Sequence, residues 1–253
     1  MKSTALIFLV SLTFGVSARA GLVVLPASVE LQNAFARRQL RVEYDGVDVT
    51  TAATFESTNT AIATVDVSGY VTPRQDGSTT LRISYNGHNA SANVNVHGMA
   101  TGRSVDFVND VVPLLSTHGC NAGGCHGKQG GQNGFQLSLF GFDSEFDHDA
   151  IVKQARGRRL FPGSPDNSLL LRKAIGLTPH GGGQRLDEAS EPYQILRRWI
   201  ELGAAPAAAD APRIVALHVL PSDSVLAKQS RQQIVVEAEF SDGSRRMSRD
   251  TPI

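Results

Sequence analysis

The 253-residue chain has very few cysteines, only Cys120 and Cys125, and both lie within the stretch HGCNAGGCHG at residues 118–127. A framework of several disulfides is therefore excluded, although a single bridge between these two thiols can still form in an oxidising compartment. The cysteine count alone does not decide what the two thiols do.

The sequence also lacks an excess of either charge, because 24 basic residues balance 24 acidic ones. Nucleic-acid binding usually needs a basic surface, so this class of function is excluded. No Ser/His/Asp set, phosphate-binding loop or paired-carboxylate pattern stands out either, so an enzyme is not favoured.

After residue 20 the sequence has no long apolar run. None of its apolar stretches reaches the ~20 residues that a membrane-spanning helix needs. Residues 1–20 carry Lys2, an apolar run at 5–16 and the triplet Ala18-Arg19-Ala20. This pattern is typical of a cleaved secretory signal peptide. The mature chain is expected to begin near Gly21 and to function in the periplasm, outside the cell or at the cell surface.

Residues 21–98 alternate apolar and polar side chains, which is the pattern of half-buried strands. Turn dipeptides such as Asp45-Gly46 and Asn86-Gly87 separate the alternating runs. Short strands with regular turns predict an all-β, immunoglobulin-like sandwich. The stretches STNTAIATVDVSGYVTP and GSTTLRISYNG resemble the bacterial immunoglobulin-like domain of group 2, which implies a spacer or adhesive module.

A repeat links this first segment to the end of the chain. The sequence LVVLP at residues 22–26 returns as LHVLP at 217–221, and QLRVEYDG from Gln39 returns as QIVVEAEFSDG from Gln233. A partial second immunoglobulin-like domain is therefore expected at residues 213–253, after a linker at 208–212. Because this copy is shorter, it is expected to be a truncated sandwich whose partner strands lie beyond Ile253.

Between the two copies, residues 103–207 change to a helical pattern. Asp106 is suited to cap a first helix, which Pro113 must kink or restart. The apolar side chains of this helix recur at helical spacing: Phe107, Val108, Val111, Val112 and Leu115.

Two more helices are expected in this segment, joined by Gly-rich loops. One begins at the pair Ser164-Pro165, and the other runs from about Pro192 to Gly203. The segment is therefore predicted to be an all-α domain.

The cysteine stretch resembles a haem attachment site in composition but not in spacing. The usual sequence is C-x-x-C-H, in which two thiols bind the porphyrin and the histidine ligates the iron. Here Cys120, Cys125 and His126 form C-x-x-x-x-C-H, and Gly123-Gly124 are expected to let the extra residues bulge away from the ring. A haem would also give a core to a domain of few helices and long loops.

Two other interpretations of these residues stay open. One is a plain Cys120–Cys125 disulfide that closes a small loop. The other is a zinc site that includes His118 and His126.

Three sequence blocks of this segment resemble the planctomycete-type cytochrome c-like domain: DFVNDVVPLLSTHGCNAGGCHG, GSPDNSLLLRKAIGLTPHGGGQRL and YQILRRWIELGA. In that family, a C-N-x-G-x-C-H-G site with four residues between the cysteines is the ordinary form. The resemblance implies one covalently bound haem c per chain, iron ligation by His126, and electron exchange with a redox partner protein.

The second axial ligand of the iron is expected to be a histidine, because residues 103–207 contain no methionine, and the alternative is an open or water-bound iron. His118 lies too close to Cys120 to cross the ring, and His148, in the acidic stretch SEFDHDA, is expected on the surface. His180 precedes three glycines and the last helix, so it is predicted to be the distal ligand.

The haem propionates are expected to pair with Arg185 and with the Arg158-Arg159 pair. The leading function is an extracytoplasmic single-electron carrier with immunoglobulin-like spacers that contact a cell surface or polysaccharide. One alternative is a haem sensor or peroxidase-like enzyme with an open distal site. The other is a non-haem adhesion or scaffold protein with a Cys120–Cys125 disulfide.

Overall fold

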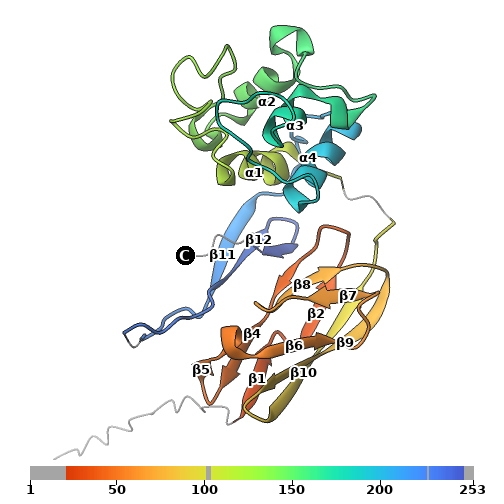
Figure 1. Cartoon of the computed structure of the whole chain (residues 1–253), viewed down its shortest axis with the longest axis vertical. Helices are drawn as coiled ribbons and strands as arrows, with labels where there is room; N and C mark the ends of the chain where they lie inside the picture. Colours follow the sequence, from red (N-terminus) through yellow and green to blue (C-terminus); the bar gives the residue numbers. More distant parts are fainter. Residues whose placement is uncertain (1–20, 101–103, 227, 248–253) are drawn as a thin grey trace, which may run out of the picture.

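The computed structural model describes residues 21–100, 104–226 and 228–247 (Figure 1). The predicted signal peptide at residues 1–20 lies outside these ranges. Within them, no helix has the length and apolar character that crossing a membrane requires.

The N-terminal segment is a β-sandwich, as its alternating pattern predicts. One sheet has the strand order β2-β10-β9-β6, and two three-stranded sheets, β1-β4-β5 and β3-β8-β7, complete the sandwich. The strands are β1 (Leu22–Leu25), β2 (Ser28–Leu31), β3 (Arg38–Gln39), β4 (Arg41–Tyr44), β5 (Val47–Asp48), β6 (Thr54–Ser57), β7 (Ala63–Val65), β8 (Tyr70–Pro73), β9 (Gly77–Tyr85) and β10 (His88–Val96).

The core of this sandwich is made by alternate residues of its strands. Leu81 and Ile83 of β9 and Val94 of β10 are fully buried. The hairpin between β9 and β10 turns at Asn86 and Gly87, whose φ angles are 48° and 81°. Both angles are left-handed, which is what this tight hairpin turn requires, so the Asn-Gly prediction is confirmed.

The repeat at the end of the chain is confirmed in its strand pairing. β11 (Ile214–Leu220), β12 (Val235–Phe240) and β13 (Arg245–Met247) form a sheet in the order β11-β12-β13, which matches β1-β4-β5. Leu22 lies opposite Tyr44 in the first copy, and Leu217 lies opposite Ala238 at the corresponding positions of the second.

The two copies differ in how far their apolar faces are covered. Val24 of β1 is 4% exposed, whereas Val219, its counterpart in β11, is 44% exposed. The second sheet contacts the first sandwich through polar groups: Arg38 pairs with Glu237, and the backbone N–H of Gln233 donates to Asp48 Oδ2 at 2.6 Å.

The middle segment consists of short helices and long loops, in the upper part of Figure 1. A π-helical turn at Phe107–Val111 leads into α1 (Val112–Thr117), and Asp106 caps the turn by accepting a bond from Asn109 N at 2.7 Å. Pro113 lies in the first turn of α1, so it restarts the helix as the sequence predicts. The other helices are α2 (Ser144–Val152), α3 (Leu169–Ala174) and α4 (Glu191–Glu201), with 3₁₀ turns at Leu139–Gly141, Gln154–Gly157 and Pro165–Asn167.

The last helix and the core around it agree with the sequence. Ser190 caps α4, Pro192 lies in its first turn, and Gly203 follows its end at φ 93°. Tyr193 and Trp199 of α4 are buried in one apolar cluster with residues of α1, α2 and α3.

The expectation that His148 lies on the surface was wrong, because residues 144–150 are partly buried. They belong to α2, where Asp147 and His148 are buried. Asp147 accepts hydrogen bonds from the backbone and hydroxyl of Ser138, and His148 Nε2 lies 2.8 Å from the carbonyl oxygen of Ala204. These partners satisfy the polar groups, so burial is tolerated.

The helical segment also contacts the first sandwich directly. Phe35, from the loop before β3, packs against the apolar cluster of the helical segment. Arg37 forms an ion pair with Glu191 in the first turn of α4, with 3.4 Å between Nε and Oε2.

Candidate functional site

A cavity of about 580 Å³ lies inside the helical segment. Its size is within the range of roughly 300–1,000 Å³ that is usual for cofactor and ligand pockets. It brings together the residues that the sequence singles out, since both cysteines, His126, His180 and Arg185 line it. Its apolar walls include Leu115, Leu137 and Leu196.

The cysteine stretch forms a compact loop directly after α1. Cys120 N donates to the carbonyl of Leu115 at 2.8 Å, and His126 N donates back to the carbonyl of Cys120 at 3.0 Å. Both cysteines are half-buried and unbridged. Burial raises the pKa of the Cys120 thiol to about 11, and the nearby Arg185 opposes this rise.

The glycines of this loop do not all have the role that the sequence suggests. Gly123 and Gly124 have no left-handed φ, and nothing lies within 4 Å of a Cβ built on Gly124. At Gly127, by contrast, a Cβ would collide with the backbone carbonyl of Asn121. The close approach that requires glycine is therefore after the second cysteine and not between the two.

His126 is held by the loop that follows it. Its Nδ1 lies 2.8 Å from the carbonyl oxygen of Phe135, and the Phe135 ring centroid is 4.5 Å from its own. A carbonyl only accepts hydrogen bonds, so Nδ1 carries the proton and Nε2 keeps a free lone pair. Burial lowers the pKa of His126, which favours this neutral form.

His180 is held in a similar way. Its Nδ1 lies 2.8 Å from the carbonyl oxygen of Gly183, so its Nε2 is also left free. The base of its loop is closed by the carbonyl of Ala174, which accepts from the backbone N–H groups of Arg185 and Leu186 at 2.8 and 3.0 Å.

The imidazoles of His126 and His180 both line the cavity and lie near each other. Their ring centroids are 6.3 Å apart and their planes are parallel to within 8°. Metal–imidazole bonds of about 2 Å put the ligating nitrogens of two opposed histidines about 4 Å apart and their ring centroids roughly 6 Å apart. The centroid distance of the pair agrees with this spacing, so a metal ion bound by both histidines is compatible with it.

The described residues do not supply the remaining ligands of such an ion. Within residues 21–100, 104–226 and 228–247, no group of three or more His, Cys, Asp and Glu side chains is placed to hold a metal. Two histidines with two free thiols beside them fit a metal whose other ligands belong to a planar cofactor, as in haem. A zinc site built from His118 is not supported, because its Nδ1 contacts the carbonyl of Leu114 and it does not line the cavity.

The charged side chains that line the cavity are all positive. Four cations line it, namely Arg158, Arg159, Lys173 and Arg185, and no carboxylate does so among the described residues. Arg185 lies on the thiol side, with its Nη2 3.9 Å from Cys125 Sγ. An anionic ligand is favoured by such a wall.

Comparison with known proteins identifies part of the β-sandwich. Residues 50–86 match the family model described as "Intimin, immunoglobulin-like domain". The chain thus contains an immunoglobulin-like domain, as its strand pattern predicts. The match includes no residue of the helical segment, and no curated protein matches the chain.

Solved structures that resemble the chain include two intimins and an S-layer protein. An intimin–Tir complex is 23% identical over 30% of this chain and 46% of that chain, with a TM-score of 0.23. Domains 5–6 of the S-layer protein SbsC are 24% identical over 33% and 45%, with a TM-score of 0.27. An intimin mutant of EHEC O157:H7 is 20% identical over 38% and 56%, with a TM-score of 0.23.

The chain spans about half the length of these solved structures. At TM-scores this low, none of the likenesses bears on function. The comparisons therefore support the immunoglobulin-like domain and offer nothing for or against the helical segment.

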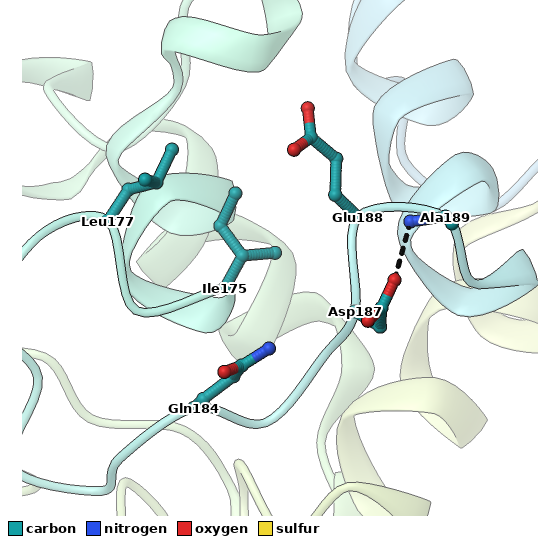
Figure 2. A pocket seen from close by; sticks show the side chains of 6 residues that line it. All are labelled: Ile175, Leu177, Gln184, Asp187, Glu188 and Ala189. Carbon is teal, nitrogen blue, oxygen red and sulfur yellow. Dashed lines mark hydrogen bonds between the residues drawn. The ribbon is translucent and has the colours of Figure 1, made fainter.

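A second recess in the helical segment is lined by residues of the chain that links α3 to α4. Figure 2 shows its lining, with the carboxylates of Asp187 and Glu188 on one side and the apolar side chains of Ile175 and Leu177 on the other. Asp187 accepts a hydrogen bond from Ala189 N at 2.8 Å. The recess contains no histidine or cysteine, so it shares none of the chemistry of the larger cavity.

Proposed function

We propose that residues 103–207 bind one haem c covalently and that the protein carries single electrons outside the cytoplasm. In this proposal Cys120 and Cys125 would hold the porphyrin, and His126 and His180 would bind the iron. The observation that carries it is the parallel pair of imidazoles with both Nε2 atoms free. Haem, when bound, supplies one-electron redox chemistry.

The chain's own residues explain why a carrier is favoured over an enzyme. If His126 and His180 both bound the iron, the protein would supply both ligands outside the porphyrin, and a substrate would have no open position. The four cations of the wall would offset the charge of the haem propionates. A sensor or peroxidase-like enzyme would need His180 to be displaced.

The test is a visible spectrum of the full chain made in a host that has haem-attachment machinery, together with an intact mass. We expect a low-spin haem spectrum and a mass increase of one haem, both lost in the Cys120→Ala/Cys125→Ala double variant. Colourless protein of unmodified mass would refute the proposal. Carbon monoxide that binds the reduced wild-type protein at once would favour the sensor or enzyme instead.

A second candidate function is adhesion or scaffolding without a cofactor. The match of residues 50–86 to an intimin immunoglobulin-like domain favours it, whereas no family match supports haem binding. The same match supports a place outside the cell or at its surface, where the domain would contact a receptor or polysaccharide.

Adhesion is tested by binding of the full chain to bacterial surface polysaccharides, with heat-denatured chain as the control. A colourless protein with a Cys120–Cys125 disulfide that binds such a surface would replace the haem proposal. Red protein that also binds would mean that both functions hold, since they use different parts of the chain.

A further inference from the structure

Resting on the proposed function, we propose that Arg159 is the positioning residue of the proximal side. It acts through Phe135: its guanidinium fixes the loop whose carbonyl holds His126 Nδ1, and this directs His126 Nε2 into the cavity. The role differs from the propionate pairing that the sequence suggests for this arginine.

The guanidinium of Arg159 joins two separate parts of the helical segment. Its Nη1 donates to the carbonyls of Ala150 and Gln154 at 2.9 and 3.0 Å, at the end of α2. Its Nη2 donates to the carbonyl of Gly134 at 3.0 Å, in the loop after the cysteines. Three of the five N–H donors of Arg159 thus join the backbone at the end of α2 to the backbone of the loop after the cysteines.

The same side chain also contacts the residue next along this loop. The guanidinium carbon lies 4.4 Å from the centre of the Phe135 ring, which is a cation–π distance. Arg159 therefore holds Phe135 in two ways: it bonds to the carbonyl of the preceding residue, Gly134, and it contacts the ring of Phe135. The carbonyl of Phe135 then meets His126 Nδ1 at 2.8 Å.

The loop between His126 and Phe135 needs such a support. Residues 127–134 form turns only, with Gly130, Gly131 and Gly134 at left-handed φ, and the single bridge joins Gln132 to Phe135. A loop of this kind has little rigidity of its own. The anchor at the end of α2 gives the histidine an orientation that the loop alone would not define.

The burial of the charge argues for a specific role. Arg159 is 4% exposed, and among the described residues carbonyls and a ring face surround it, with no carboxylate beside it. A buried charge without a counter-ion is costly, and an apolar residue would fill the same space at less cost. The planar guanidinium of Arg159 bonds to three carbonyls at once. Neither an apolar side chain nor lysine can make this set of bonds.

The experiment compares Arg159→Gln and Arg159→Lys with the matched control Arg158→Gln. Arg158 is the adjacent cation and lines the same cavity, but it makes none of these carbonyl bonds. Nitrogen NMR of the full chain without haem reports the tautomer of His126. For the haem-loaded chain, the readouts are the low-spin fraction and the midpoint potential.

We expect wild type and Arg158→Gln to show a single Nδ1–H tautomer for His126. Because Arg158→Gln also removes a cation of the cavity wall, it is the control for the tautomer and not for the potential. Arg159→Gln should show a mixture of tautomers and a several-fold larger high-spin fraction. It should also show a more negative potential, because a buried positive charge near the iron is lost. Arg159→Lys keeps the charge and not the fork, so it should lose the single tautomer while its potential shifts less.

Circular dichroism identifies variants that do not fold. If Arg159→Gln is unfolded, Arg159→Lys decides the matter, because it keeps the charge and much of the volume. A folded Arg159 variant with the tautomer and spin state of wild type overturns the inference. Colourless wild-type protein would overturn the proposed function instead, and the tautomer measurement would still judge the role of Arg159.

Discussion

Lys173 Nζ donates a hydrogen bond to the carbonyl of Pro179 at 2.6 Å, one residue before His180. This bond and the backbone closure at Ala174 hold the loop that presents His180. His126, by contrast, follows a loop tied to α1 and is supported through the buried Arg159. The rings of both histidines are held by a carbonyl at 2.8 Å, but their loops have different supports, and if both bind the iron as proposed, the bond of Lys173 would help to keep His180 in place.

The first prediction tests the lysine that holds the His180 loop. Lys173→Met removes the bond to Pro179 and keeps an apolar stem, so His180 should spend more time away from the iron. We expect carbon monoxide to bind the reduced variant several-fold faster than wild type, measured by stopped flow. Lys128→Met is the control, because Lys128 is exposed and is not among the cavity-lining residues. Equal rates in all three proteins would show that Lys173 does not hold the loop.

The second prediction concerns His180 as the distal ligand. Two histidine ligands favour ferric iron more than a His/Met pair does, so wild type should have a low midpoint potential in a redox titration. His180→Met should raise this potential, and His180→Ala should open the iron to carbon monoxide. A strongly positive potential in wild type, or no change in either variant, would mean that His180 is not a ligand.

Much of the fold follows from local sequence signals. Asn86-Gly87 specifies its hairpin because both residues accept left-handed φ, and Pro113 restarts a helix because it lacks an N–H. Ser190 and Pro192 mark the start of α4 in the same way. Each of these signals depends on one or two neighbouring residues only.

Other features depend on contacts that no local pattern encodes. The acidic stretch that contains Asp147 and His148 predicts a surface position. Both are buried in α2, because the Ser138 hydroxyl bonds to Asp147 and the carbonyl of Ala204 bonds to His148. Phe135 acts through its carbonyl, and any residue has one, so its side chain gives no signal of its role. Arg159 is visible as a cation in the sequence, but its three carbonyl partners are not.

In the cysteine loop, the sequence indicated which candidate residues come together but not which glycine the fold requires. The residue types Cys120, Cys125 and His126 identified the candidate site, and the structure brings them to one cavity with His180. The glycines were misjudged, because the position that tolerates no side chain is Gly127. Only the folded path of the chain reveals that collision with Asn121.

The third prediction follows from this difference between glycines. Gly127→Ala places a Cβ against the carbonyl of Asn121, and overpacking of this kind costs about 1–3 kcal/mol of unfolding free energy. Gly124→Ala is the matched control: it meets open space at an ordinary φ, so it should be neutral or stabilise by about 0.4–1 kcal/mol. Urea unfolding measures both. Similar free energies for the two variants would show that the loop does not take this path.

The fourth prediction concerns the alkaline limit of stability and depends on Tyr193. Burial, together with the acceptor Asp166 at 2.8 Å, raises the pKa of Tyr193 to about 12 from its usual value near 10. Above pH 10 the unfolded chain releases this proton and the folded chain keeps it, so the free energy of unfolding falls as the pH rises. This contribution is fully present below pH 10 and is lost by about pH 12, with a total of about 3 kcal/mol.

Tyr193→Phe isolates this contribution because phenylalanine keeps the ring and cannot ionise. Asp166 keeps its second partner in the variant, since Arg197 Nε lies 2.9 Å from Asp166 Oδ1. We therefore expect the variant to be less stable than wild type at pH 8, where the hydroxyl bond is lost, and the difference to shrink or reverse between pH 10 and 12. Urea unfolding at a series of pH values gives the difference, and phenolate absorbance gives the titration of Tyr193 itself. A constant difference across this range would mean that the Tyr193 hydroxyl is not buried against Asp166, and the packing of α4 against the 3₁₀ turn at Pro165–Asn167 would need to be revised.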